Sequence, residues 1–172
     1  MASGDTLVVW QALDNLPPDA DFATYDTILT TSADEPDDIV SVLDFDPGAP
    51  NEFAVFSAVL PEHYGGGGFT LSLLWVANTT TGNVKWDASI KRLADAVSIL
   101  SATYDAIQTV TTGTDGTARA LNTSVITFTN AQIDGLLKNE LFFLAVERDA
   151  ADAADTMNSN DAELIAVYLI ET

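Results

Sequence analysis

Apolar and polar residues alternate with a period of two along most of the chain. A clear case is segment 83–93, whose side chains divide into an apolar set (Val84, Trp86, Ala88 and Ile90) and a polar set (Lys85, Asp87, Ser89 and Lys91). This period is typical of a strand with one buried face and one solvated face. By the same criterion we predict strands at residues 7–13, 23–30, 39–46, 53–60, 69–77, 83–93, 106–112, 122–129, 140–149 and 162–171.

Stretches rich in Pro, Gly, Asp and Asn separate these strands, and each of these residue types favours turns. Only segments 130–137 and 149–157 carry signals for a helical turn. Many short strands with frequent breaks favour a sandwich or a barrel over alternating βαβ units. We therefore predict an all-β, antiparallel, jelly-roll-like β-sandwich of about 8–10 strands, with at most one or two short helical turns. A length of 172 residues fits a single domain, 1–172, in which residues 1–38 form an N-terminal arm or edge strands.

Segments 69–77 and 83–93 are separated by a short link that ends in Gly82. Glycine adopts positive φ at little steric cost, so this link is compatible with a hairpin. In that hairpin Asn78 lies opposite Asn83, and Trp75 lies opposite Trp86 on the same face. We predict Trp75 and Trp86 as an aromatic pair in the core.

Two strands near the C-terminus are apolar on both faces, which indicates that both faces are covered. One interpretation is a central strand covered by loops or by the second sheet. The other is a subunit interface, because apolar patches are expected there. The candidate interface residues are Phe142, Leu144, Ile165, Val167 and Leu169.

Charge limits the partners that we expect. The formal net charge is −20, from 26 acidic and 6 basic residues, so nucleic acid and anionic membranes are repelled. The chain has no cysteine, which excludes disulfides and thiolate metal sites. The N-terminus lacks the positive residues of a secretory signal, and no apolar run approaches the roughly 20 residues that span a bilayer. We expect a protein made in the host cytoplasm.

The chain's one histidine, His63, precedes four consecutive glycines at residues 65–68. A phosphate-binding loop would place glycines between a strand and a helix, usually with a nearby lysine, whereas here strands flank them. We interpret the glycines as a structural loop and predict no catalytic residue, so we do not expect an enzyme. We also predict no cofactor and no metal site; the alternative is Ca²⁺, because Asp-rich loops occur at residues 18–22, 34–38, 44–46 and 149–155.

The order of motifs from about Leu43 to Thr172 resembles small virion structural proteins of tailed phages and prophages. The residues that carry the resemblance are Pro61, Tyr64, glycines 65–68, Trp75, Trp86, Arg92, Arg148, Asp149, Ala162, Glu163 and Leu164. The resemblance implies a jelly-roll capsid decoration (cement) protein on the virion surface, or a fibre-associated module. It also implies a homotrimer with the major capsid protein or another virion protein as partner. In that reading, patches around Lys85, Lys91 and Arg92, or the acidic loops, dock to the shell.

The alternative function is a carbohydrate- or receptor-binding module of a phage tail or head fibre. Sandwiches bind sugars through exposed aromatic rings, and the candidates are Trp10, Tyr25, Tyr64 and Tyr104. For each ring taken alone, packing in the core or at its rim is the favoured interpretation. Solvent exposure of the rings therefore discriminates between the two interpretations.

Overall fold

The computed structural model describes residues 4–30, 37–48 and 50–172. These residues form ten strands and two 3₁₀ turns, and they contain no helix with the length and apolar character needed to span a membrane. The strands are β1 (Thr6–Gln11), β2 (Thr24–Leu29), β3 (Ile39–Phe45), β4 (Glu52–Val59), β5 (Phe69–Val76), β6 (Asn83–Leu93), β7 (Gln108–Gly113), β8 (Asn122–Phe128), β9 (Leu141–Arg148) and β10 (Ala162–Glu171). The turns are η1 (Ala12–Asp14) and η2 (Asn130–Ile133).

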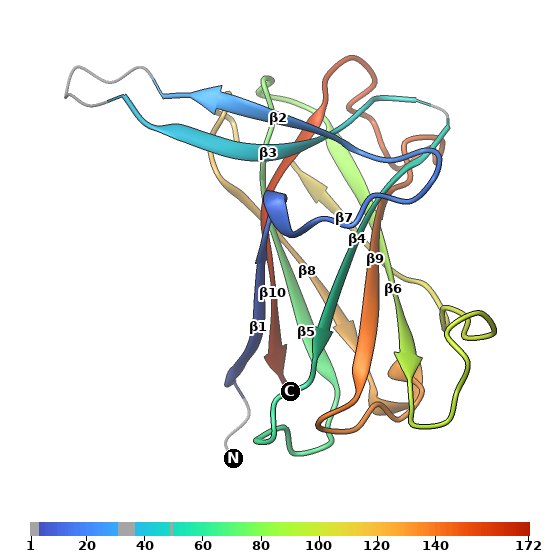
Figure 1. The fold of residues 1–172 in the computed structure, drawn as a ribbon. Helices are drawn as coiled ribbons and strands as arrows, with labels where there is room; N and C mark the ends of the chain where they lie inside the picture. Colours follow the sequence, from blue (N-terminus) through green and yellow to red (C-terminus); the bar gives the residue numbers. More distant parts are fainter. Residues whose placement is uncertain (1–3, 31–36, 49) are drawn as a thin grey trace.

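Two antiparallel sheets pack face to face as a sandwich (Figure 1). The larger sheet has the order β2-β3-β10-β5-β8, and β1 also pairs with β10; the smaller has the order β4-β9-β6-β7. β10 pairs with β5 along one edge, while β3 and β1 share its other edge. The predicted all-β, jelly-roll-like sandwich is thus confirmed.

The core lies between the sheets and explains the alternation in the sequence. Val84, Trp86, Ala88 and Ile90 of β6 all point inward and are buried. Trp75 and Trp86 contact each other edge to face, with ring centroids 6.1 Å apart. They do so across the sandwich, because β5 and β6 belong to different sheets.

The predicted hairpin between segments 69–77 and 83–93 is therefore wrong. Both edges of β5 are taken, one by β10 and the other by β8, so β5 has no free edge for β6. β6 instead pairs with β9 and β7. The link after Ala77 crosses from one sheet to the other, and its end is held where Thr114 donates its backbone N–H to the Gly82 carbonyl oxygen at 2.9 Å.

The interface candidates also need correction. Phe142, Leu144, Val167 and Leu169 are completely covered inside the sandwich, so a single chain already buries them. In β10 the register shifts between Leu164 and Ala166, which turns Leu164, Val167 and Leu169 to the same inner side. Ile165 alone among the candidates is partly exposed, on the outer face of the larger sheet.

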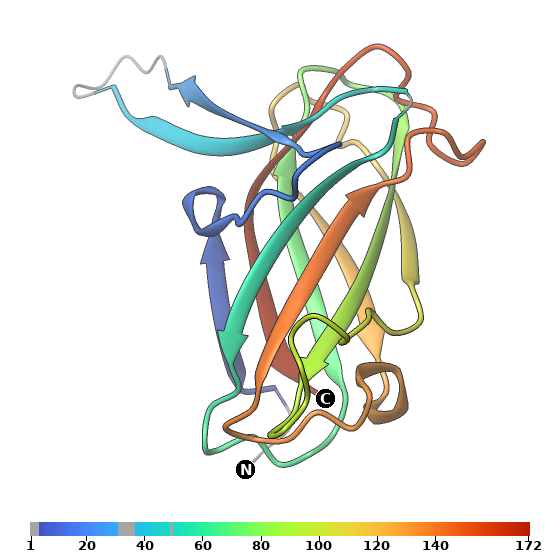
Figure 2. The same ribbon diagram turned by 45° about the vertical axis from the view of Figure 1, so that its right-hand side comes forward.

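The β2–β3 pair extends away from the body of the sandwich (Figures 1 and 2). β2 pairs only with β3, and β3 pairs with β10 only from Leu43 to Phe45. The free part of this pair carries exposed Leu29 and Ile39, whereas exposed Tyr25 lies opposite Leu43, where β3 still pairs with β10. Residues 31–36, which include part of the predicted Asp-rich loop 34–38, lie outside the described residues.

One buried ion pair joins the two layers at the end of β9. The Arg148 guanidinium is 1% exposed and donates two hydrogen bonds to the Asp155 carboxylate, at 2.9 and 3.0 Å. It also donates to the backbone carbonyl oxygens of Phe45, Met157 and Asn160. Full hydrogen bonding of this kind is what makes a buried charge tolerable.

Candidate functional site

An open groove of about 570 Å³ crosses the outer face of the smaller sheet. Its floor comes from the outward side chains of β4, β9 and β6, which lie in register as cross-strand rows. The rows are Phe53–Glu147–Asp87, Val55–Ala145–Ser89 and Ser57–Phe143–Lys91. Among the floor residues that line the groove, Val55, Ala145 and Ser89 of the middle row are smaller than their neighbours Phe53, Glu147, Phe143 and Lys91. Two segments beside the sheet complete the hollow as its walls.

The segment that follows η1 forms one wall of the groove. It runs along the free edge of β4, where Leu16 donates its N–H to the Val55 carbonyl oxygen at 2.7 Å. Phe53 in turn donates its N–H to the carbonyl oxygen of Asp21 at 2.8 Å. These bonds hold Asp19 and Asp21 beside the sheet, so the wall is an extension of the sheet edge.

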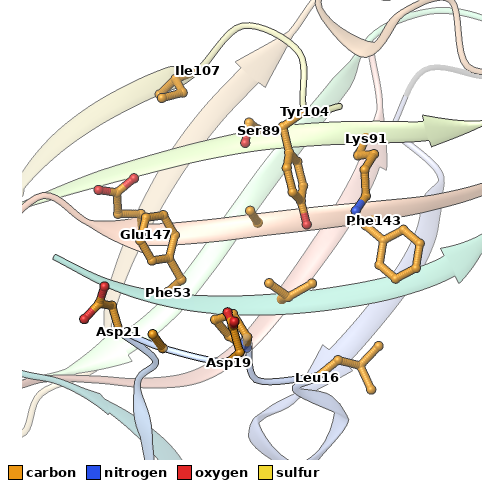
Figure 3. A pocket seen from close by; sticks show the side chains of 14 residues that line it. Leu16, Asp19, Asp21, Phe53, Ser89, Lys91, Tyr104, Ile107, Phe143 and Glu147 are labelled. Atoms are coloured by element: carbon orange, nitrogen blue, oxygen red, sulfur yellow. The ribbon is translucent and has the colours of Figure 1, made fainter. Parts of the chain in front are cut away.

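Tyr104 and Ile107, which precede β7, form the opposite wall. The Asp105 N–H donates to the Ile90 carbonyl oxygen at 2.9 Å and anchors this segment to β6. The Tyr104 ring leans over the floor beside Lys91 and Phe143 (Figure 3). Partial burial raises the pKa of the Tyr104 hydroxyl, which therefore stays protonated and able to donate a hydrogen bond near neutral pH.

The charged groups of the groove lie toward different ends. Glu147 and Asp21 lie near Phe53 at one end, and Lys91 lies with Phe143 at the other (Figure 3). Burial raises the pKa of Glu147, and the neighbouring charges of Asp87 and Asp149 act in the same direction. The Asn51 amide opposes them by donating to the Glu147 carboxylate at 2.7 Å. The groove thus offers acceptors, one cation and three aromatic rings.

The sugar-binding candidates from the sequence divide into two groups. Trp10 and Tyr64 are each 4% exposed and belong to the core. Tyr104 is 37% exposed in the groove, while Tyr25 is 52% exposed and lines a separate hollow beside η1. The solvent exposure that sugar binding requires is therefore found for Tyr25 and Tyr104, whereas the rings of Trp10 and Tyr64 are buried.

Sequence reasoning missed Phe53 and Phe143 as groove residues. The signal was available, since 53–60 and 140–149 are apolar on both faces. Phe142 and Leu144 were chosen as the outward set, whereas the structure turns Phe143 and Ala145 outward. A twofold alternation does not by itself say which of its two faces points outward.

The glycine run is a structural loop next to the end of β10. Its third member, Gly67, accepts a hydrogen bond from the Tyr64 hydroxyl, and Gly65 donates its N–H to the Glu171 carboxylate at 2.7 Å. A Cβ at Gly68 would lie 2.0 Å from the carbonyl oxygen of Phe128, so β8 approaches too closely for any side chain. His63 is exposed in the preceding turn, away from the groove lining.

Lys85 and Arg92, two of the three proposed docking cations, are held by carboxylates. Lys85 pairs with Asp149 at 2.7 Å and with Asp152 at 2.8 Å, and Arg92 pairs with Glu140 at 2.7 Å. Among the described residues, no group of three or more His, Asp or Glu side chains is placed to hold a metal ion. Ca²⁺ at the Asp-rich loops stays a prediction.

A pair of acidic residues lies on the outer face of the larger sheet, outside the groove. Asp44 of β3 lies directly opposite Glu163 of β10. One oxygen of each carboxyl is buried, and neither of these two oxygens has a hydrogen-bond partner among the described residues. Burial, followed by the charges of Glu163 and Asp26, raises the pKa of Asp44 to about 7. Burial also raises the pKa of Glu163, against the opposing effect of its ion pair with Arg119.

Comparisons with known proteins give similarities of fold only. No protein-family model and no curated protein matches the chain. Among solved structures, the CBM22-1 xylan-binding domain from Paenibacillus barcinonensis Xyn10C is 9% identical, with a TM-score of 0.44 and coverage of 100% of this chain and 99% of that one. A family 11 carbohydrate-binding module from Clostridium thermocellum, in complex with a β-1,3-1,4-mixed-linked tetrasaccharide, is 9% identical. Its TM-score is 0.45, with coverage of 98% of this chain and 96% of that one. At these TM-scores the similarities say nothing about a ligand. Any argument about a ligand therefore has to rest on the residues of the groove.

Proposed function

We propose that this chain is a non-catalytic carbohydrate-binding β-sandwich and that its glycan lies in the groove over β4, β9 and β6. The observation that carries the proposal is the concave outer face, which combines aromatic rings with carboxylates. Phe53, Tyr104 and Phe143 supply the rings, while Asp21 and Glu147 supply acceptors. Pockets that bind small ligands are mostly apolar surfaces with a few placed polar groups. Sugars present both apolar C–H faces and hydroxyl donors, so they match both kinds of surface.

The shape of the groove supports a chain-like ligand. It is open along the sheet and is bounded on its two sides by the segments around Leu16 and Tyr104. We propose no reaction, because Asp87 lies beside Glu147 on the neighbouring strand rather than across the groove from it. The carboxylate of Glu147 is also already bound by Asn51.

The test is isothermal titration calorimetry with a panel of neutral oligosaccharides derived from β-glucan, xylan and mannan. Tyr104→Ala should weaken binding by about tenfold, since truncating an aromatic anchor commonly has effects of this size. Tyr25→Ala is the matched control, because it removes an exposed tyrosine that lines a different hollow, and it should bind like the wild type. Failure of every oligosaccharide to bind at millimolar concentration, or equal losses in the two variants, would refute the proposal.

The capsid decoration role, the trimer and a virion protein as partner stay predictions.

A further inference from the structure

Lys91 differs from every other cation of the chain. The sequence has 6 lysines and arginines and 26 acidic residues. Five of the cations form ion pairs with carboxylates, namely Lys85, Arg92, Arg119, Lys138 and Arg148. Within the described part of the chain, Lys91 has no carboxylate at ion-pair distance, although acids outnumber cations. Its lack of a partner is therefore not explained by a shortage of carboxylates.

Two aromatic rings hold the Lys91 ammonium in the groove. Its Nζ lies 4.8 Å from the centroid of the Tyr104 ring and 4.6 Å from that of the Phe143 ring. Ring faces attract a cation electrostatically and restrict where it lies, but they leave its positive charge in place. The three N–H donors of the ammonium remain available to an acceptor from outside the protein.

Glu147 of the groove floor and its neighbour Asp87, which lies outside the lining, are both at a distance from Lys91. Asp87 is four residues from Lys91 along β6, and Glu147 is four residues from Phe143 along β9. At about 3.3 Å per residue, these positions are separated by roughly 13 Å along the sheet. In Figure 3, Glu147 and Lys91 lie toward opposite ends of the groove. An anionic group placed at Lys91 would therefore meet a cation without facing Glu147 or Asp87.

We propose that Lys91 binds an anionic substituent, a carboxylate or a sulfate ester, carried by a glycan that is otherwise neutral. This inference rests on the proposed function, because it assigns the ligand class for the same groove. A lysine is a compact point charge that suits either anion. A glycan with an acid on every unit is disfavoured, since a net charge of −20 repels a polyanion as a whole. The ligand class is a neutral backbone with sparse acidic units.

The experiment compares three oligosaccharides that share one backbone and length. One is neutral, one carries a single uronic acid, and one carries a single sulfate ester. The wild type should bind one or both anionic forms about tenfold more tightly than the neutral form, as expected for one charge-assisted hydrogen bond. Whichever of the two anionic oligosaccharides binds more tightly shows whether Lys91 prefers a carboxylate or a sulfate ester.

Lys91→Met should lose this preference, so that its own affinities for the neutral and anionic forms agree within about twofold. Lys91→Arg should retain the preference. Lys138→Met is the control, since Lys138 pairs with Glu62 outside the groove, and it should behave like the wild type. Thermal unfolding of each variant shows that it is folded.

Equal affinity of the wild type for the neutral and anionic forms would overturn this inference and leave the proposed function standing. A preference that persists in Lys91→Met would also overturn it. If none of the oligosaccharides binds, the proposed function fails and this inference fails with it.

Discussion

Replacement of Asp44 by asparagine should stabilise the protein at neutral and alkaline pH. Asp44 lies opposite Glu163 with a buried oxygen that has no partner among the described residues, and its pKa is raised from 3.8 to about 7. The folded state therefore binds more protons than the unfolded state between these values. The free energy of unfolding falls as the pH rises through this window, and the destabilisation is complete above about pH 7. Asparagine is neutral at every pH and avoids this loss.

The magnitude follows from the pKa change. At about 1.4 kcal/mol per pH unit, the full difference would amount to about 4 kcal/mol. Asp44 is only partly buried, so solvent screening reduces the figure, and we expect Asp44→Asn to be about 1–2 kcal/mol more stable than the wild type at pH 8. At pH 3.5 the two proteins should agree within about 0.5 kcal/mol, because the wild-type carboxyl is then protonated.

The assay is urea unfolding at a series of pH values, followed by the fluorescence of the buried Trp75 and Trp86. Asp38→Asn is the control, since it removes the same charge from an exposed position on the same hairpin. Its stability should change by less than about 0.5 kcal/mol. The reasoning is refuted if the advantage of Asp44→Asn is as large at pH 3.5 as at pH 8, or if Asp38→Asn reproduces it.

Two further substitutions test the packing. Gly68→Ala should lower the free energy of unfolding by more than about 2 kcal/mol, because its Cβ would clash with the Phe128 carbonyl oxygen. Gly116→Ala is the control: a Cβ there meets open space, so the free energy of unfolding should change by less than about 1 kcal/mol. Similar melting temperatures for the two glycine variants would contradict the close approach. Arg148→Met should cost about 3–5 kcal/mol in urea unfolding, because it leaves the Asp155 charge buried without a cation. Adding Asp155→Leu should recover part of that loss, and a double variant less stable than the single one would argue against this cause.

Local alternation was enough to locate the strands, but not to pair them. Each predicted strand overlaps an observed one within about two residues, since the period of two depends only on which side chains are buried. Pairing depends on segments far apart in the chain. Trp75 and Trp86 were expected together and do contact each other, yet they come from facing sheets rather than adjacent strands. A short glycine-containing link fits a hairpin and a crossover between sheets equally well.

The groove was harder to anticipate than the fold. Its lining combines three strands with two segments that lie far apart in the sequence, around Asp19 and Tyr104. Tyr104 was named as a candidate because it is aromatic, whereas Phe143 was missed because its neighbour Phe142 was assigned to the outer face. The register shift after Leu164 was equally hidden, since a bulge changes which residues face inward without changing composition.

The position of β10 has a consequence for biogenesis. The other nine strands of the described sandwich precede it in the sequence, yet β1, β3 and β5 each pair with it along one edge. The larger sheet therefore cannot form completely until the ribosome has released β10. Until then, the edges of β1, β3 and β5 that pair with β10 have no backbone partner. Such edges are templates for wrong association. The surplus of negative charge, which repels neighbouring nascent chains, would protect them during that interval.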